Sequence, residues 1–206
     1  FIPFIEKKIS IVIPTFNEEN NIVKLVNEIK SELKNKDFEI IIVDDGSTDS
    51  TTTNVLKEFK DHANIKLLQR QHDKGLLQSI KFGLQVITGE YFVVMDGDGQ
   101  HSASDINNLV NGLEEKDLVI GVRDLKNLNA ISIKRLFLSK LFNKILQFIL
   151  STKISDPLTG FFAGKVSLLN EKFFLLANSG FKVLLDLIFS NKKQSINIIE
   201  KEIKFN

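Results

Sequence analysis

The chain has no cysteine among its 206 residues, which excludes disulfide bonds and thiol chemistry. It also lacks a large excess of charge of either sign. The formal net charge is +1, so no strong overall field favours binding to nucleic acid. No run of about 18 uninterrupted apolar residues occurs, and the sequence therefore predicts no transmembrane helix within these residues.

The motifs of three common enzyme classes are also missing. There is no Gly-x-x-x-x-Gly-Lys-Ser/Thr segment, and no Gly-x-Gly-x-x-Gly follows the first predicted strand. These absences argue against a P-loop protein and against a dinucleotide-binding protein. No Gly-x-Ser-x-Gly segment occurs, which argues against a serine hydrolase. The composition, 43% hydrophobic and 26% charged, is that of a globular domain.

Short apolar runs alternate with segments of helical period along the first 121 residues. The predicted strands are 9–13, 38–43, 65–68, 91–95 and 118–121, and the predicted helices between them are 20–33, 50–59, 75–87 and 105–115. This alternation predicts an α/β fold with a mostly parallel central sheet and helices on both faces. We expect residues 1–206 to form a single domain.

Polar clusters follow three of these strands, at residues 14–18, 44–49 and 96–101. Ligands of such sheets bind outside the carboxyl ends of the strands. One cluster could fall there by coincidence, but three on one edge of a sheet favour a shared binding site.

The third cluster carries two carboxylates, Asp96 and Asp98, separated by one glycine. Such a pair at the end of a rigid strand can bind Mg²⁺ or Mn²⁺ and leave positions open for phosphate oxygens. Gln100 supplies a third candidate oxygen ligand. The alternative interpretation is a solvated turn, because many Asp-x-Asp pairs bind nothing.

Other side chains suit the remaining parts of a nucleotide diphosphate sugar. Asp44 and Asp45 could accept hydrogen bonds from ribose hydroxyls or from the base edge. Arg123 and Arg135 could contact phosphate oxygens with their planar guanidinium groups. The alternatives are that residues 44–49 form only a turn and helix cap, and that Arg123 is an ordinary surface arginine.

A segment from about residue 131 to 151 has a wide apolar face and a basic face with Lys134, Arg135, Lys140 and Lys144. It is either a core helix with a solvated edge or a helix that lies on a membrane surface. The sequence ends at Asn206 without a helix cap or polar tail, so we expect the protein to continue beyond it.

Three motifs, at residues 11–22, 43–51 and 94–101, resemble in order and spacing the inverting glycosyltransferases of family 2, which have the GT-A fold. Two more, Asp-Pro-Leu-Thr-Gly-Phe-Phe-Ala at 156–163 and Gly-Phe-Lys-Val-Leu-Leu-Asp at 180–186, resemble the dolichyl- and polyprenyl-phosphate hexosyltransferases, of which dolichyl-phosphate mannosyltransferase is the best-known type.

The resemblance implies a metal-dependent transfer of a hexose, with inversion, from a GDP-mannose or UDP-glucose type of donor to a polyprenyl or dolichyl phosphate. It implies action in the cytoplasm at the inner face of a membrane. One alternative is transfer to a saccharide hydroxyl, with Asp156 or Asp186 as general base. Another is a nucleotide-sugar-binding module without turnover. The donor sugar stays open, because the segment between Arg123 and Arg135 lacks the glycine-rich loop common in mannosyl enzymes.

The resemblance also implies roles by position, and the residues group by role. The catalytic residues are Asp98, Arg123 and Arg135. The donor-binding residues are Pro14, Thr15, Phe16, Glu18, Asp44, Asp45, Ser47 and Asp96. The residues that bind the acceptor phosphate are Arg135, Ser139 and Lys182. The metal ligands are Asp96, Asp98 and Gln100.

Overall fold

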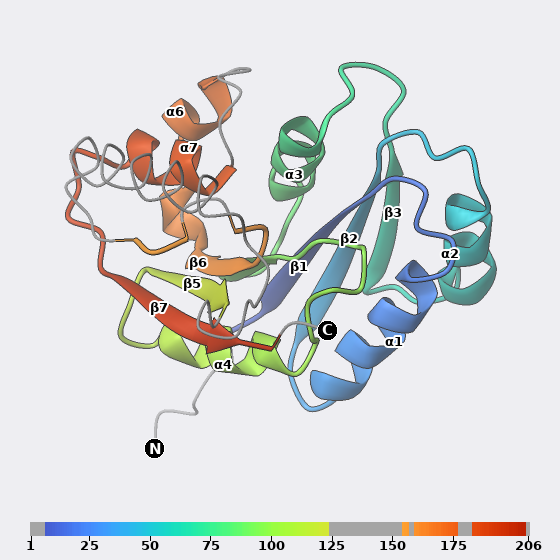
Figure 1. Cartoon of the computed structure of the whole chain (residues 1–206), viewed down its shortest axis with the longest axis horizontal. Helices are drawn as coiled ribbons and strands as arrows, with labels where there is room; N and C mark the ends of the chain where they lie inside the picture. Colours follow the sequence, from blue (N-terminus) through green and yellow to red (C-terminus); the bar gives the residue numbers. More distant parts are fainter. Residues whose placement is uncertain (1–6, 124–153, 157–158, 177–182, 205–206) are drawn as a thin grey trace, which may run out of the picture.

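The computed structural model describes residues 7–123, 154–156, 159–176 and 183–204 (Figure 1). Its seven-stranded sheet, covered by helices on both faces, confirms the predicted α/β fold. The predicted helix at 131–151 lies outside the described residues. No helix within these ranges has both the length and the hydrophobicity needed to cross a bilayer.

The strands and helices that were predicted up to residue 123 are all present, with ends shifted by a few residues. The strands are β1 Ile9–Thr15, β2 Phe38–Asp44, β3 Ile65–Gln69, β4 Tyr91–Val94, β5 Leu118–Arg123, β6 Phe162–Lys165 and β7 Ile198–Ile203. The helices are α1 Ile22–Glu32, α2 Thr51–Phe59, α3 Leu76–Leu84, α4 Asp105–Gly112, α6 Glu171–Leu175 and α7 Val183–Ser190, with a 3₁₀ turn at Val166–Leu168.

The strand order across the sheet is β3-β2-β1-β4-β6-β5-β7. β6 runs antiparallel to β4 and β5, and the other neighbouring pairs are parallel. From β1 the chain first builds outward through β2 and β3, and then returns to place β4 on the opposite side of β1. Loops diverge at such a switch point, so the carboxyl ends of β1 and β4 are where a ligand crevice is expected.

Both faces of the sheet are buried, which explains the near-continuous apolar runs of the central strands. Ile9, Ile11 and Ile13 belong to the core cluster that includes side chains of α1, α2 and α4, whereas Val12 belongs to the cluster of α3, α6 and α7. This alternation follows from the two-residue period of a strand. Figure 1 shows the two helical layers on opposite sides of the sheet.

One buried carboxylate stabilises the amino ends of the central strands. Glu39 on β2 is 2% exposed and accepts hydrogen bonds from Ser10, Thr88 and Lys66. Burial raises the pKa of Glu39, but these hydrogen bonds, led by that of the Thr88 amide, outweigh burial and lower the pKa to about 2.

Two strands were not predicted from the sequence, namely β6 and β7. β6 has only four residues, Phe-Ala-Gly-Lys, and is formed by antiparallel pairing with β4 and β5. β7 is an edge strand of mixed polarity, Ile-Ile-Glu-Lys-Glu-Ile, that pairs with β5. The apolar stretch around 173–189 contributes α6 and α7, which cover the same face as α3.

Candidate functional site

The three polar clusters meet at one edge of the sheet, as predicted. Thr15 at the end of β1 is in register with Asp44 of β2, and Val12 is in register with Val94 of β4. The loop after β4 packs directly on β1: a Cβ at Gly97 would lie 2.9 Å from Cγ2 of Thr15 and 3.0 Å from the carbonyl oxygen of Pro14. The glycine between the two aspartates is therefore required by this close approach.

Asp96 lies close to one side chain and to the backbone of one glycine. Its Oδ2 lies 3.7 Å from Nε2 of His101, which is buried and packs on the ring of Phe161. On the other side, a Cβ at Gly160 would lie 2.6 Å from Cγ of Asp96, and closer still to Oδ2. The carboxylate is 30% exposed, so it remains accessible to a ligand.

The donor set around Asp96 and Asp98 fits a hard divalent cation. Asp98 is half-buried and its Oδ1 accepts a hydrogen bond from the Gln100 amide at 3.0 Å, while the Gln100 side chain is exposed. Across the described ranges, no group of three or more His, Cys, Asp or Glu side chains is placed to hold a metal. Two carboxylates and one amide suit Mg²⁺ or Mn²⁺, which take their remaining ligands from water and phosphate oxygens.

The turn after β2 is organised by Asp44, which is buried. Oδ2 accepts hydrogen bonds from the amides of Gly46 and Ser47 at 3.0 Å each, and Oδ1 accepts one from the Ser47 hydroxyl. The hydrogen bonds of the alternative interpretation, a turn at residues 44–49, are therefore present. The structure leaves any contact of Asp44 with a nucleotide as a prediction.

The loops after β1 and β2 are joined to each other. The Asn17 amide donates to Oγ of Ser47 at 2.8 Å, and the Glu18 amide donates to Oγ1 of Thr51 at 2.8 Å. Asp49 accepts hydrogen bonds from Thr51 and from the Glu19 amide. Burial raises the pKa of Asp49, but these hydrogen bonds outweigh it and lower the pKa. This network holds the two loops together beside the exposed ring of Phe16.

Asp45 anchors the loop that precedes α3. Its Oδ1 pairs with Nη1 of Arg70 at 2.9 Å, and its Oδ2 accepts from the Gly75 amide at 2.6 Å. Nη1 of Arg70 also donates to Oγ of Ser79 at 3.0 Å. Both carboxylate oxygens of Asp45 are thus bonded inside the protein, and its role in donor binding stays a prediction. Nothing in the sequence pattern indicated Arg70 as its partner.

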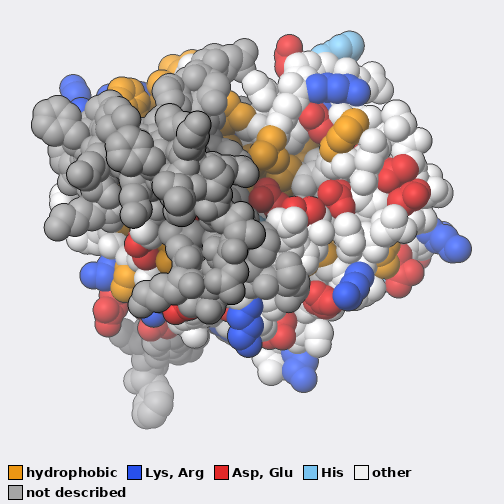
Figure 2. Space-filling model, viewed as in Figure 1, with side chains coloured by type: hydrophobic (Ala, Val, Ile, Leu, Met, Phe, Trp, Pro, Cys, Tyr) orange, Lys and Arg blue, Asp and Glu red, His pale blue; other side chains and the backbone are white. Residues whose placement is uncertain are grey.

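Lys74 places a positive charge next to the turn after β2. A Cβ at Gly46 would lie 2.5 Å from its Nζ, so the ammonium group lies against the backbone of this turn. Arg123 ends β5, and its side chain is outside the described residues, as are Arg135, Ser139 and Lys182. Figure 2 shows acidic side chains gathered near the middle of this face, around a hollow with an apolar floor.

Asp186 is buried in the core, where it forms an ion pair. Its Oδ2 lies 3.0 Å from Nζ of Lys81, and both residues are buried between α3 and α7. Lys81 also donates a hydrogen bond to the carbonyl oxygen of Leu176. The two residues are 105 positions apart, so no local pattern in the sequence could indicate the pair. Asp186 is a poor candidate for a general base, because its carboxylate is shielded and already neutralised.

The comparisons with known proteins agree with this geometry. The chain matches the family described as Glycosyl transferase family 2 over residues 10–173. A dolichol-phosphate mannosyltransferase of Pyrococcus furiosus is 29% identical over 204 residues, which cover 92% of this chain and 54% of that protein. A dodecaprenyl-phosphate galacturonate synthase of Rhizobium johnstonii is 33% identical over 121 residues, which cover 56% of this chain and 36% of that protein.

Among solved structures, glucosyl-3-phosphoglycerate synthase from Mycobacterium tuberculosis, in complex with Mn²⁺, UDP and phosphoglyceric acid, aligns with a TM-score of 0.70. The alignment covers 95% of this chain and 68% of that chain at 19% identity, which shows a shared fold and confirms the predicted GT-A fold. The chain spans about half the length, or less, of the curated relatives named above.

Proposed function

Because the chain belongs to glycosyl transferase family 2, we propose that it transfers a hexose from a nucleotide diphosphate sugar to a polyprenyl phosphate. The observation that carries this proposal is the Asp96-Gly97-Asp98 loop at the switch point between β1 and β4. Its first carboxylate lies next to His101 and Gly160. Such a loop offers oxygen ligands where a donor diphosphate would enter.

The donor would lie across the joined loops after β1 and β2. Phe16 is 55% exposed beside this network and offers a flat apolar surface for the base. Asp96 and Asp98, with Gln100, would hold Mg²⁺ or Mn²⁺. When bound, the cation neutralises the negative charge that develops on the diphosphate leaving group. Lys74 lies above the adjacent turn and supplies a further positive charge for phosphate oxygens.

A lipid phosphate suits the described residues better than a saccharide hydroxyl. A phosphate monoester is largely anionic at neutral pH, so it attacks without a strong general base. Asp186, one of the two carboxylates considered as a base for a hydroxyl acceptor, is instead paired with Lys81 in the core. Two relatives, a dolichol-phosphate mannosyltransferase and a dodecaprenyl-phosphate galacturonate synthase, support the same acceptor class.

The chemistry then rests on position and charge rather than on covalent catalysis. In-line attack by the lipid phosphate on the anomeric carbon gives inversion, and the leaving group departs as the nucleoside diphosphate. The rigid β1–β4 edge holds the donor in one orientation, which lowers the entropic cost of the reaction. Arg123 and Arg135, proposed as phosphate contacts, would reduce repulsion between the two anions. We propose that this takes place in the cytoplasm at the inner face of a membrane.

The test is transfer of radiolabelled sugar from GDP-mannose and UDP-glucose to farnesyl phosphate with Mg²⁺ or Mn²⁺. We expect label in the organic phase after extraction, and none with chelator. Label found only in saccharide acceptors would contradict the lipid acceptor. The control is Asp98→Asn, which keeps the side-chain volume but removes the charge. Turnover equal to wild type in this variant, with an unchanged circular dichroism spectrum, would contradict the metal site.

A further inference from the structure

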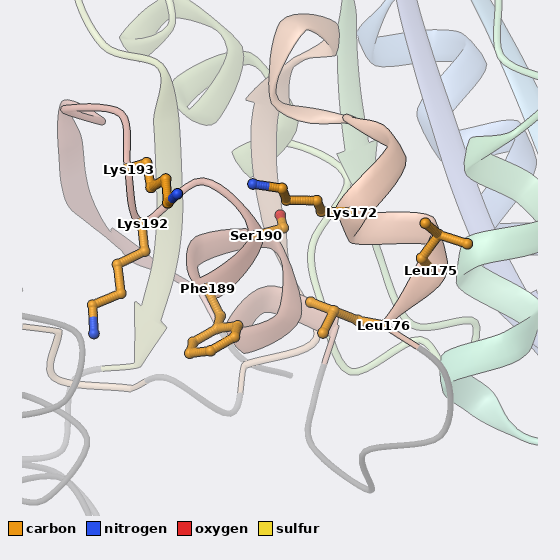
Figure 3. Close-up of a pocket in the computed structure, with 7 residues that line it drawn as sticks. All are labelled: Lys172, Leu175, Leu176, Phe189, Ser190, Lys192 and Lys193. Atoms are coloured by element: carbon orange, nitrogen blue, oxygen red, sulfur yellow. The ribbon is translucent and has the colours of Figure 1, made fainter.

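An open groove of about 600 Å³ lies between α6, the end of α7 and the turn after it (Figure 3). Its lining combines apolar side chains with ammonium groups and one hydroxyl: Leu175, Leu176 and Phe189, then Lys172, Lys192 and Lys193, and Ser190. None of the candidate donor or metal residues lines it. The groove is therefore a separate feature that the proposed chemistry does not use.

The apolar part of the groove is unusually exposed. Leu175 at the end of α6 is 70% exposed, and Phe189 near the end of α7 is 49% exposed. Isolated exposed apolar residues are common on protein surfaces, but these two line one groove from two different helices. Together they form a protruding apolar edge rather than a closed pocket.

The charge of the groove has one sign. Three lysines line it and no acidic residue does, although Glu171 precedes Lys172 in the sequence. The whole chain carries a formal net charge of only +1, so this concentration of positive charge is local. The chemistry that complements it is an anionic headgroup attached to an apolar chain.

The two walls of the groove are held in place by buried polar contacts. Nδ2 of Asn191 donates to the carbonyl oxygens of Leu168 and Leu187 at 2.8 Å each, and its Oδ1 accepts from Asn170 at 2.9 Å. Asn170 in turn caps α6 through the amide of Phe173. Lys81 binds the carbonyl oxygen of Leu176 and pairs with Asp186 on α7. The groove is thus preformed.

We propose that this groove docks the protein onto the surface of a bilayer that contains anionic lipids. Leu175 and Phe189 would enter the boundary between headgroups and acyl chains, and the three lysines would contact anionic headgroups. A free phosphate ion would account for the lysines but not for the exposed apolar edge. This inference rests on the proposed function, because membrane docking serves the reaction only if the acceptor is a lipid phosphate embedded in a membrane.

The test is flotation with phosphatidylcholine vesicles, with and without phosphatidylglycerol, in the absence of sugar donor. The test variants are Leu175→Ser/Phe189→Ser and Lys172→Gln/Lys192→Gln/Lys193→Gln. The matched control is Leu56→Ser/Lys57→Gln/Lys60→Gln, on α2 and at the residue that follows it, where Leu56 is 50% exposed and both lysines are exposed. Figure 1 shows α2 at the far end of the sheet from α6 and α7.

We expect wild-type protein and the α2 variant to bind anionic vesicles equally. Each lysine removed from the groove should weaken partition by about fivefold, so the triple variant should lose about 100-fold, and added salt should reduce the difference. The Leu175→Ser/Phe189→Ser variant should bind less well to both kinds of vesicle. Wild-type protein that stays unbound, or groove variants that bind as wild type or no worse than the α2 variant, would overturn the proposal.

A second measurement separates this inference from the proposed function. Transfer to water-soluble farnesyl phosphate should be unchanged in the groove variants, whereas transfer to a long polyprenyl phosphate in anionic vesicles should fall with their partition. Absence of both transfers in wild-type protein would count against the proposed function. Soluble transfer together with unchanged vesicle transfer in the groove variants would count against the groove alone.

Discussion

The contact between Gly160 and Asp96 allows a substitution outside the Asp96-Gly97-Asp98 loop to test the candidate metal site. In Gly160→Ala the new methyl group would lie 2.6 Å from Cγ and 2.7 Å from Oδ1 of Asp96, and nearer still to Oδ2. Real Cβ atoms essentially never come within 3.0 Å of such neighbours. Gly160 is not among the glycines with positive φ, so its backbone accepts alanine and the carboxylate has to move.

The expected effect on activity is large and the effect on stability is small. A displacement of about 1 Å at a catalytic group costs about 100-fold in rate, which corresponds to about 2.7 kcal/mol of transition-state stabilisation. The Asp96 side chain is 30% exposed, so it can rotate toward solvent without disturbing the core. We therefore expect kcat/KM to fall about 100-fold while the free energy of unfolding changes by less than about 1 kcal/mol.

The assay is Mn²⁺ titration followed by electron paramagnetic resonance, alongside initial rates and urea unfolding. The matched control is Gly164→Ala on β6, whose methyl would lie 2.6 Å from the fully buried ring of Phe92. This variant should lose about 1–3 kcal/mol of stability through overpacking and keep its Mn²⁺ affinity. If Gly160→Ala binds Mn²⁺ and turns over as wild type does, Asp96 is not a metal ligand.

Three further predictions concern other parts of the fold. Lys81→Met should cost about 3–5 kcal/mol in urea unfolding because it removes the ammonium group that neutralises the buried Asp186 carboxylate, and Lys81→Met/Asp186→Leu should recover most of this loss. Equal unfolding free energies of wild type and Lys81→Met would refute this reasoning. Because the pKa of Glu39 is lowered to about 2, its ionised carboxylate stabilises the fold by about 3 kcal/mol above about pH 4.5, and this stabilisation is lost as the pH falls toward 2. In Glu39→Gln, the free energy of unfolding should no longer show this fall between about pH 4.5 and 2, as measured by urea unfolding at each pH. Phe16→Ala should weaken UDP or GDP binding about tenfold in calorimetry without changing the melting temperature, whereas unchanged affinity would exclude stacking on its ring.

The sequence predicted the parts of the fold that depend on local patterns. The apolar runs of β1, β2 and β4 are buried on both faces, so they stand out without any knowledge of their partners. The placement of Asp44 and the Asp96 loop at the same edge of the sheet could also be predicted, because neighbouring parallel strands end at one edge. The proposed role of each side chain still rests on experiment.

The rest of the site depends on contacts between distant residues, and these leave no periodic signal. β6 contains Gly164 and Lys165 and forms a strand only because β4 and β5 offer it hydrogen bonds on both sides. Gly160 belongs to one of the motifs that carry the family resemblance, but only the structure shows its close contact with Asp96. Asp186 was a candidate general base from the sequence, and only the structure shows that its carboxylate forms an ion pair with Lys81.

Helix α3 connects the two functional surfaces proposed for this chain. At its amino end, the Gly75 amide is bound by Asp45, next to the turn that Asp44 organises. Six residues later, or about 9 Å along the helix axis, Lys81 binds Leu176 and Asp186 on either wall of the groove. Because both ends of this connection are hydrogen-bonded, one helix sets the separation between the donor loop and the groove. A bilayer bound at the groove would therefore keep one orientation relative to the donor loop.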